Sequence, residues 1–152
     1  MHTARPQNST LLLDNQLCFA LYSASLAMTK LYKPLLEALG LTYPQYLVML
    51  VLWEQNGLTV SAMGERLSLD SGTLTPLLKR MEVAGFLTRQ RSTQDERRVE
   101  VLLTADGVEL QTRAAQVPAC VIAQTGCTLP ELVGMTQQLK QIRSRIAAAQ
   151  TP

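Results

Sequence analysis

The stretch SLDSGTLTPLLKRMEVAGFLTRQRSTQDERRVEVLLT, residues 68–104, decides the fold. Asp70 is placed to cap a helix of about residues 71–84, and Gly85 is placed to close it. A shorter helical segment, residues 61–67, lies just before the turn at Asp70. The stretch therefore predicts two consecutive helices joined by a tight turn.

A β-hairpin is predicted directly after these helices. Residues 87–91 and 99–103 alternate apolar and polar side chains, and the polar tract 92–98 separates them. Helix, turn, helix and hairpin follow one another in the order of a winged helix. We therefore predict a mainly α-helical fold with a small β-hairpin wing, a winged helix-turn-helix.

The preceding segments supply the core. Thr42 and Gln45 form a capping box for a helix of residues 43–55, which is apolar almost all round and belongs at the centre of the core. Residues 58–60 suit a very short strand. A long amphipathic helix is predicted over residues 13–33.

Proline is expected to interrupt that first helix. The residue before Pro34 disfavours the α region, so we predict a break there and a separate short helix, residues 34–39, that stops at Gly40.

Two further helices are predicted at the C-terminal end. Thr104 is placed to cap residues 105–117, and Pro118 opens a short helical piece that ends at Gly126. A second capping box at residues 128–131 starts a helix to about residue 149, with an apolar stripe that has no partner within the chain. That stripe predicts a homodimer.

Composition limits the class of protein. With 152 residues and 47% hydrophobic content, the chain suits one compact subunit. No apolar run approaches the roughly 20 residues that span a bilayer, and no secretory signal follows His2 and Arg5. We expect a cytoplasmic protein without a membrane partner. The only histidine is His2 and no CxxC pair occurs, so we expect no zinc site and no cofactor.

Positive charge is concentrated between Lys79 and Arg98. Six basic residues against three acidic ones leave a local charge of +3 there, and because the whole chain carries +2, the remainder carries −1. This pattern favours a polyanion such as double-stranded DNA, although a solvated charged face would have the same composition.

The second helix of the winged helix supplies candidate DNA contacts. Ser71, Thr73 and Thr75 lie near its N-terminal end and suit base edges or phosphates. Lys79 and Arg80 follow one to two turns later and suit phosphates. Alternatively, Ser71 and Thr73 serve only to cap the helix, and the sequence leaves both interpretations open.

The hairpin supplies the remaining DNA candidates. Arg97 at its tip suits a narrow minor groove, and Asp95 is expected to brace it through a charge-assisted hydrogen bond. Arg89 and Arg91 on the first strand are also assigned to DNA. The alternative is a charged turn without a binding role.

Three widely separated cysteines, Cys18, Cys120 and Cys127, favour sensing, catalytic or buried thiols over a disulfide framework. From the residues alone, Cys18 is interpreted as an ordinary core cysteine. All four tyrosines follow it before residue 50, however, and a thiol beside phenolic hydroxyls can sense peroxide. We expect Cys18 in mid-helix without a basic neighbour, so tyrosine hydroxyls, with or without the amino end of the helix beginning at Tyr43, would stabilise its thiolate.

Several motifs together resemble the organic hydroperoxide resistance regulators, a branch of the MarR family, from about Leu12 to the last helix. The Asp-Glu-Arg wing is shared across MarR proteins, whereas the cysteine and tyrosine set is specific to the peroxide-sensing branch. The matching segments are DNQLCF (14–19), YKPLL (32–36), LTYPQY (41–46), LDSGTLTPLLKR (69–80) and DER (95–97).

The resemblance implies a dimeric, non-enzymatic repressor of a pseudo-palindromic DNA operator. Cys18 would react with an organic hydroperoxide, Tyr32 and Tyr43 would hydrogen-bond its sulfur, and Tyr22 would share the pocket. An apolar wall that includes Phe19 would favour alkyl hydroperoxides over hydrogen peroxide. In this scheme residues 1–152 form a single MarR-like subunit, whose parts are the winged-helix module, about 57–104, and the dimerisation helices, about 12–40 and 105–149.

Family members differ in the step after oxidation of the sensor. Two-cysteine members form a disulfide with the other subunit through a cysteine near position 123, which is Ala123 in this chain. Cys127 is our candidate for the resolving thiol because it lies at a helix start, and Cys120 stays open as the second candidate. One-cysteine members condense instead with a small thiol.

Three other functions compete with this interpretation. A MarR-type repressor released by a small phenolic ligand is the nearest. A thiol peroxidase is disfavoured by the lack of a βαβ pattern and of an acid or arginine beside Cys18. A non-specific architectural DNA binder is disfavoured because the basic patch is modest.

Overall fold

The computed structural model describes residues 8–152, so His2 and Arg5 lie outside the described residues. The chain divides after Ala115 into two compact units. It is mostly helical with one two-stranded antiparallel hairpin, which confirms the predicted fold class. No helix in this described range is long and apolar enough to cross a membrane.

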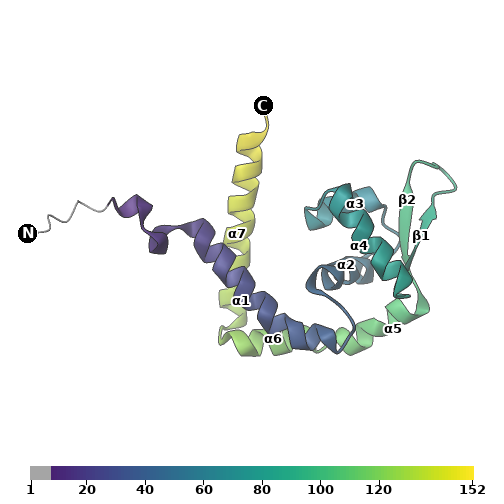
Figure 1. Cartoon of the computed structure of the whole chain (residues 1–152), viewed down its shortest axis with the longest axis horizontal. Helices are drawn as coiled ribbons and strands as arrows, with labels where there is room; N and C mark the ends of the chain where they lie inside the picture. The colour runs from purple at the N-terminus through teal and green to yellow at the C-terminus, as the bar shows by residue number, and fades with distance from the viewer. Residues whose placement is uncertain (1–7) are drawn as a thin grey trace, which may run out of the picture. The chain divides into compact units, whose positions relative to one another are not determined.

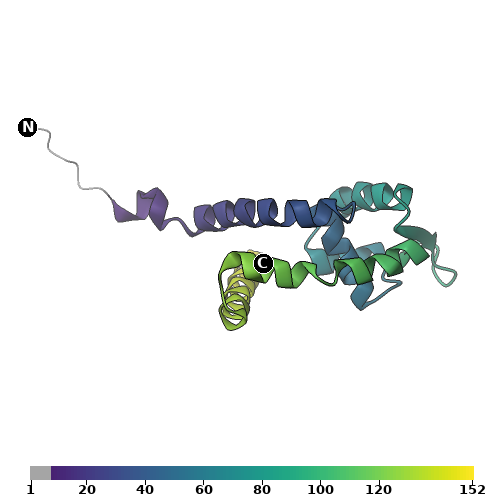
Figure 2. The same ribbon diagram turned by 90° about the horizontal axis from the view of Figure 1, so that it is seen from below.

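The first unit begins with two short 3-10 turns, η1 (Ser9–Leu11) and η2 (Leu13–Asn15), followed by α1 (Leu17–Glu37). The predicted break at Pro34 is wrong, because α1 runs through this proline. Pro34 lies on an exposed side of the helix, where water can bind the carbonyl it leaves unpaired, and the buried Leu36 holds the turn beyond it. The N-terminal part of α1 extends well past the winged-helix module (Figure 2).

Helix α2 (Tyr43–Glu54) is the centre of the core, as predicted. Both capping-box bonds are present: the Thr42 N–H donates to Gln45 Oε1 at 3.0 Å, and the Gln45 N–H donates to Thr42 Oγ1 at 3.4 Å. Gly40 precedes it with φ +72°, and the Leu41 N–H then donates to the Leu36 carbonyl at 3.0 Å. The buried side chains of α2 are Tyr46, Val48, Met49, Val51 and Leu52.

The helix-turn-helix consists of α3 (Val60–Leu67) and α4 (Ser71–Val83). Asp70 caps α4, since its Oδ1 accepts the Thr73 N–H at 2.8 Å. The turn requires Gly64, because a Cβ there would lie 2.7 Å from the Leu69 carbonyl oxygen. The sequence therefore located this motif correctly.

The hairpin β1 (Leu87–Arg91) and β2 (Val99–Leu103) has the predicted bounds, with Arg89 opposite Val101 in the register. The predicted short strand is present as a single bridge of Thr59 to Glu100, supported by the Val101 N–H donating to the Leu58 carbonyl at 2.8 Å. The hairpin thus lies beside α3 and α4 (Figure 1).

Helix α5 (Ala105–Ala114) ends three residues before the predicted position, Val117. Pro118 cannot donate a hydrogen bond to the Ala114 carbonyl, which explains the earlier end. Two long-range bonds hold α5: the Trp53 indole N–H donates to the Gly107 carbonyl at 2.9 Å, and the Arg113 guanidinium donates to the Ala38 carbonyl at 2.6 Å.

The second unit contains α6 (Val117–Thr125) and α7 (Leu129–Gln150), with Gly126 in the left-handed region between them at φ +70°. The predicted capping box of Thr128 and Glu131 is present at the start of α7. No residue of α7 is buried, and its exposed large apolar side chains are Leu129, Val133, Met135, Leu139 and Ile146.

Candidate functional site

One face of α4 carries the polar residues that the sequence assigned to DNA. Its apolar side is buried through Leu74, Leu77, Leu78 and Met81. The five candidates all lie on the exposed side; they are Ser71, Thr73, Thr75, Lys79 and Arg80. The cap of this helix is Asp70, and within the described residues the hydroxyls of Ser71 and Thr73 make no hydrogen bond. These hydroxyls are thus free to meet a ligand.

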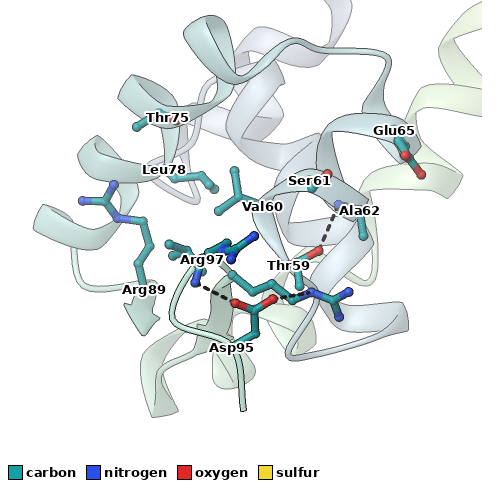
Figure 3. Close-up of a pocket in the computed structure, with 12 residues that line it drawn as sticks. Thr59, Val60, Ser61, Ala62, Glu65, Thr75, Leu78, Arg89, Asp95 and Arg97 are labelled. Carbon is teal, nitrogen blue, oxygen red and sulfur yellow. Dashed lines mark hydrogen bonds and ion pairs between the residues drawn. The ribbon is translucent and has the colours of Figure 1, made fainter. Parts of the chain in front are cut away.

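A hollow of about 600 Å³ lies where α3, α4 and the hairpin meet (Figure 3). Thr59 and Ser61 line it from the start of α3, Thr75 from α4, and Asp95 and Arg97 from the loop between the strands. Hydroxyl and guanidinium donors therefore converge on this hollow. Such a set suits the oxygen atoms of a polyanion.

The loop between the strands differs from expectation in one pairing. Asp95 accepts the backbone N–H of Arg97 at 3.0 Å, but its ion pair, 3.8 Å long, is with Arg98 Nε. The expectation that Asp95 braces the Arg97 guanidinium is thus wrong. The Arg97 side chain is exposed, and in the described part of the chain no acidic group pairs with it.

Arg89 and Arg91 share a face of β1 but differ in environment. Arg91 is exposed. The Arg89 side chain is only 25% exposed, and its Nη2 lies 3.2 Å from Glu82 Oε1 of α4. Glu82 Oε2 also accepts the backbone N–H of Arg89 at 2.8 Å. These contacts, the backbone N–H first and the guanidinium next, hold the pKa of Glu82 below its usual value.

Cys18 lies in the first turn of α1 and is exposed. The interpretation of Cys18 as a core residue in mid-helix is therefore wrong, because the apolar segment before it is two 3-10 turns and not helix.

Three tyrosines form a cluster between α1 and α2. The ring centroids of Tyr32 and Tyr43 are 5.0 Å apart, and those of Tyr32 and Tyr46 are 5.9 Å apart, both tilted. Burial raises the pKa of all three phenols, so at neutral pH they remain protonated hydrogen-bond donors. The sequence reasoning left Tyr46 out of the pocket. Its spacing of three residues from Tyr43 on a capped helix was the available signal.

Within a single chain, the Cys18 thiol does not reach the tyrosine cluster. Cys18 and Tyr32 lie fourteen residues apart on the straight helix α1, which separates them by about 21 Å at 1.5 Å per residue. Tyr22, one turn after Cys18, is 63% exposed and also lies outside the cluster. The four predicted sensor residues therefore form two groups: Cys18 with Tyr22, and Tyr32 with Tyr43.

The other two cysteines lie in the second unit, and both are half-buried. Cys120 lies within α6. Cys127 lies one residue before the cap Thr128, its N–H donates to Thr125 Oγ1 at 3.2 Å, and its Sγ is 3.7 Å from the Thr125 carbonyl oxygen. Exposure consequently does not separate the two candidates for a resolving thiol.

Comparison with known proteins gives a consistent group of relatives. The family described as transcriptional regulator SarA/Rot matches residues 30–113. An organic hydroperoxide resistance transcriptional regulator from Bacillus subtilis (strain 168) is 55% identical over 123 residues, covering 79% of this chain and 84% of the relative.

Solved structures agree with these relatives. Reduced AbfR bound to DNA superimposes with a TM-score of 0.81 at 34% identity, covering 92% of this chain and 98% of AbfR. Disulfide-formed AbfR superimposes with a TM-score of 0.60 at 38% identity, covering 86% and 91%. AbfR is a protein of Staphylococcus epidermidis. By fold and by sequence identity, the chain belongs to the MarR family of winged-helix transcriptional regulators, in the branch of the organic hydroperoxide resistance regulators.

Proposed function

We propose that this protein is a DNA-binding repressor, acting in the bacterial cytoplasm, that leaves its operator when an organic hydroperoxide oxidises Cys18. The observation that carries the proposal is the exposed Cys18 thiol in the first turn of α1, in a chain 55% identical to an organic hydroperoxide resistance regulator. The relative AbfR is known in reduced, overoxidised and disulfide forms, two of them bound to DNA.

The winged-helix module, about residues 57–104, would bind double-stranded DNA. The exposed hydroxyls of Ser71, Thr73 and Thr75 suit base edges, and the basic side chains that follow them suit phosphates. The exposed Arg97 guanidinium at the wing suits a narrow minor groove. A pseudo-palindromic operator would match a homodimer.

A homodimer would also complete the sensor. The distance of about 21 Å along α1 means that the Cys18 thiol cannot meet Tyr32 or Tyr43 of its own chain. We infer that each Cys18, with its neighbour Tyr22, meets Tyr32 and Tyr43 of the partner subunit. The helices of residues 12–40 and 105–149 would supply the interface, and the exposed apolar side chains of α1 and α7 support this assignment.

The chemistry balances as a two-electron oxidation. The Cys18 thiolate attacks one peroxide oxygen, the S–O bond forms, the O–O bond breaks, and the second oxygen takes a proton and leaves as the alcohol. The sulfur is thereby oxidised to sulfenic acid. A second thiol, Cys127 or Cys120 of the partner subunit, then attacks that sulfur, which forms a disulfide and releases water.

Release from DNA requires oxidation to favour the non-binding arrangement of the two winged helices. A shift from 1:99 to 99:1 corresponds to about 5.5 kcal/mol. A disulfide that pulls the start of α1 toward the other subunit would apply this bias to both recognition helices together.

The test is the Cys18→Ser variant. We expect it to bind operator DNA as the reduced protein does and to stay bound when cumene hydroperoxide is added, whereas the wild-type protein dissociates, both followed by fluorescence anisotropy. Release of the variant by hydroperoxide would overturn the proposal.

A small-molecule inducer is the second candidate. A largely apolar cavity of about 300 Å³ lies beside Tyr43, between the end of α1 and the start of α2, with Lys33 and Glu37 among its lining residues. Such a cavity suits a small phenolic ligand. Under this alternative, Cys18→Ser would still respond to the ligand and hydroperoxide would have no effect on either protein.

A further inference from the structure

We propose that Glu82 and Arg89 form a clamp that sets the position of the wing against the recognition helix α4, and that Arg89 is a positioning residue and not a DNA contact. The proposal rests on the proposed function, since the clamp acts through DNA binding. It replaces the assignment of Arg89 to DNA made from the sequence.

The clamp joins two elements through both oxygens of one carboxylate. Glu82 Oε2 accepts the backbone N–H of Arg89 at 2.8 Å, and Glu82 Oε1 faces Arg89 Nη2 at 3.2 Å. One bond therefore holds the strand itself and the other holds its side chain. Glu82 lies in the last turn of α4 and Arg89 in the middle of β1, so the pair spans the turn that connects them.

Burial separates this arginine from the others in the wing. The side chains of Arg89 and Glu82 are 25% and 35% exposed, and within residues 8–152 the buried Arg89 Nε has no hydrogen-bond partner. Arg91 and Arg97 are exposed. Figure 3 shows the Arg89 side chain extending along α4, while Asp95 and Arg97 lie at the loop between the strands. Loss of Glu82 would leave further donors of Arg89 unpaired in this half-buried place.

The negative charge of Glu82 makes the two possible roles of this residue distinguishable by DNA affinity. A carboxylate near a DNA-binding face repels phosphates, so its removal should strengthen binding if charge were its only effect. Removal of a positioning group has the opposite effect, because the wing then loses its fixed orientation. The two roles therefore predict changes of opposite sign.

Glu65 provides the matched control. It lies on α3 at the edge of the hollow that Arg89 also lines, with its side chain directed away from Arg89 and Arg97 (Figure 3), it is exposed, and in the described residues it takes part in no ion pair. Glu65→Gln and Glu82→Gln each remove one negative charge from the DNA-binding module, but only the second replaces one of the two acceptor oxygens of the clamp with an NH2 group, so that one of its two bonds to Arg89 is lost.

The experiment measures affinity of the reduced dimer for a duplex that the wild-type protein selects from a random-sequence library, over a series of salt concentrations. We expect Glu65→Gln to bind as tightly as wild type or more tightly. Glu82→Gln should bind roughly tenfold more weakly with an unchanged salt dependence, since no phosphate contact is lost. Circular dichroism at the binding temperature verifies that each variant is folded.

Arg89→Gln gives a second, independent measurement from the wing side. A positioning role predicts the same weakening as Glu82→Gln, an unchanged salt slope, and a double variant no weaker than either single one. A phosphate contact predicts instead that Arg89→Gln lowers the salt slope by about one.

The outcomes distinguish failure of the proposed DNA-binding function from failure of the clamp alone. If wild type selects no duplex, the proposed function fails and the clamp's role with it. If wild type binds but Glu82→Gln binds as tightly as Glu65→Gln, or Arg89→Gln lowers the salt slope, the clamp alone is overturned.

Discussion

At the scale of single residues, Tyr46 is a buried ring that packs against Tyr32, one of the residues proposed for the sensor. Tyr46 is only 3% exposed, and its ring lies 5.9 Å from that of Tyr32. Tilted aromatic pairs contribute about 0.5–1.5 kcal/mol beyond their burial. The ring of Tyr46 thus fixes the orientation of Tyr32, whose hydroxyl we assign to the sensor.

Substitution of Tyr46 separates the ring from its hydroxyl. In the described residues the Tyr46 hydroxyl makes no hydrogen bond to the protein, so Tyr46→Phe should change the free energy of unfolding by less than about 0.5 kcal/mol. Tyr46→Leu removes the ring and should cost about 1–3 kcal/mol. Urea denaturation measures both values.

The same pair of variants tests the link to the sensor. Tyr46→Leu should slow the oxidation of Cys18 by cumene hydroperoxide, measured by mass spectrometry, whereas Tyr46→Phe should not. Equal oxidation rates in the two variants would contradict a role for the ring in orienting Tyr32.

At the scale of helices and strands, the features that depend on neighbouring residues were predicted better than those that depend on tertiary packing. The capping boxes at Thr42 and Thr128 and the bounds of the hairpin follow from side chains within a few residues of one another, and these predictions are confirmed. Pro34 disfavours helix locally, yet α1 continues through it because Leu36 is buried in the core. Only the folded chain decides such a competition.

The pairing of charges was the least predictable feature. Asp95 has two arginines within three positions, and side-chain geometry selects Arg98 and not Arg97. Glu82 and Arg89 lie on different elements, so their contact depends on the turn at Gly85. The sequence placed the Cys18 thiol in mid-helix, because the two 3-10 turns before it carry the same apolar spacing as a helix.

The clamp between α4 and β1 predicts a pH dependence of stability. The pKa of Glu82 is lowered in the folded chain from its usual value of 4.5. A carboxyl group of this kind stabilises the fold above its unfolded pKa, and that contribution is lost as the pH falls through the folded pKa. Wild type should therefore lose its stability advantage over Glu82→Gln as the pH falls below about 4.5.

Urea denaturation of wild type and Glu82→Gln over a range of pH measures whether the stability difference between them decreases toward acid pH. The two curves of unfolding free energy should converge on the acid side and run parallel near neutral pH. Parallel curves throughout would show that the ionised form of Glu82 contributes no stability.

At the scale of the whole molecule, the first unit connects α1 to the wing through short bonds. The Arg113 guanidinium ties α5 to the end of α1 at the Ala38 carbonyl, 2.6 Å away, and β2 leads directly into α5 at Thr104. The Trp53 indole ties the same helix to α2. If oxidation shifts α1, as the proposed function requires, these contacts would carry the shift through α5 to the hairpin.

The choice of resolving thiol is the prediction that belongs to the assembled dimer. A disulfide requires the two Cα atoms to come within about 7 Å, so one of the sulfurs must travel if the reduced dimer holds them apart. Cys127 lies outside the helices, one residue before the cap of α7, and it can move with the loop after Gly126. Cys120 lies inside α6, and moving it means moving or unwinding that helix.

We therefore expect hydroperoxide to convert wild type and Cys120→Ser into covalent dimers on non-reducing gels, with a peptide that joins Cys18 to Cys127, while Cys127→Ser stays monomeric on the gel. A covalent dimer that persists in Cys127→Ser and disappears in Cys120→Ser would move the role to Cys120. A mass increase that corresponds to a small thiol on Cys18, without any crosslinked peptide, would remove the two-cysteine mechanism, because the sulfenic acid would then be consumed before either protein thiol reaches it.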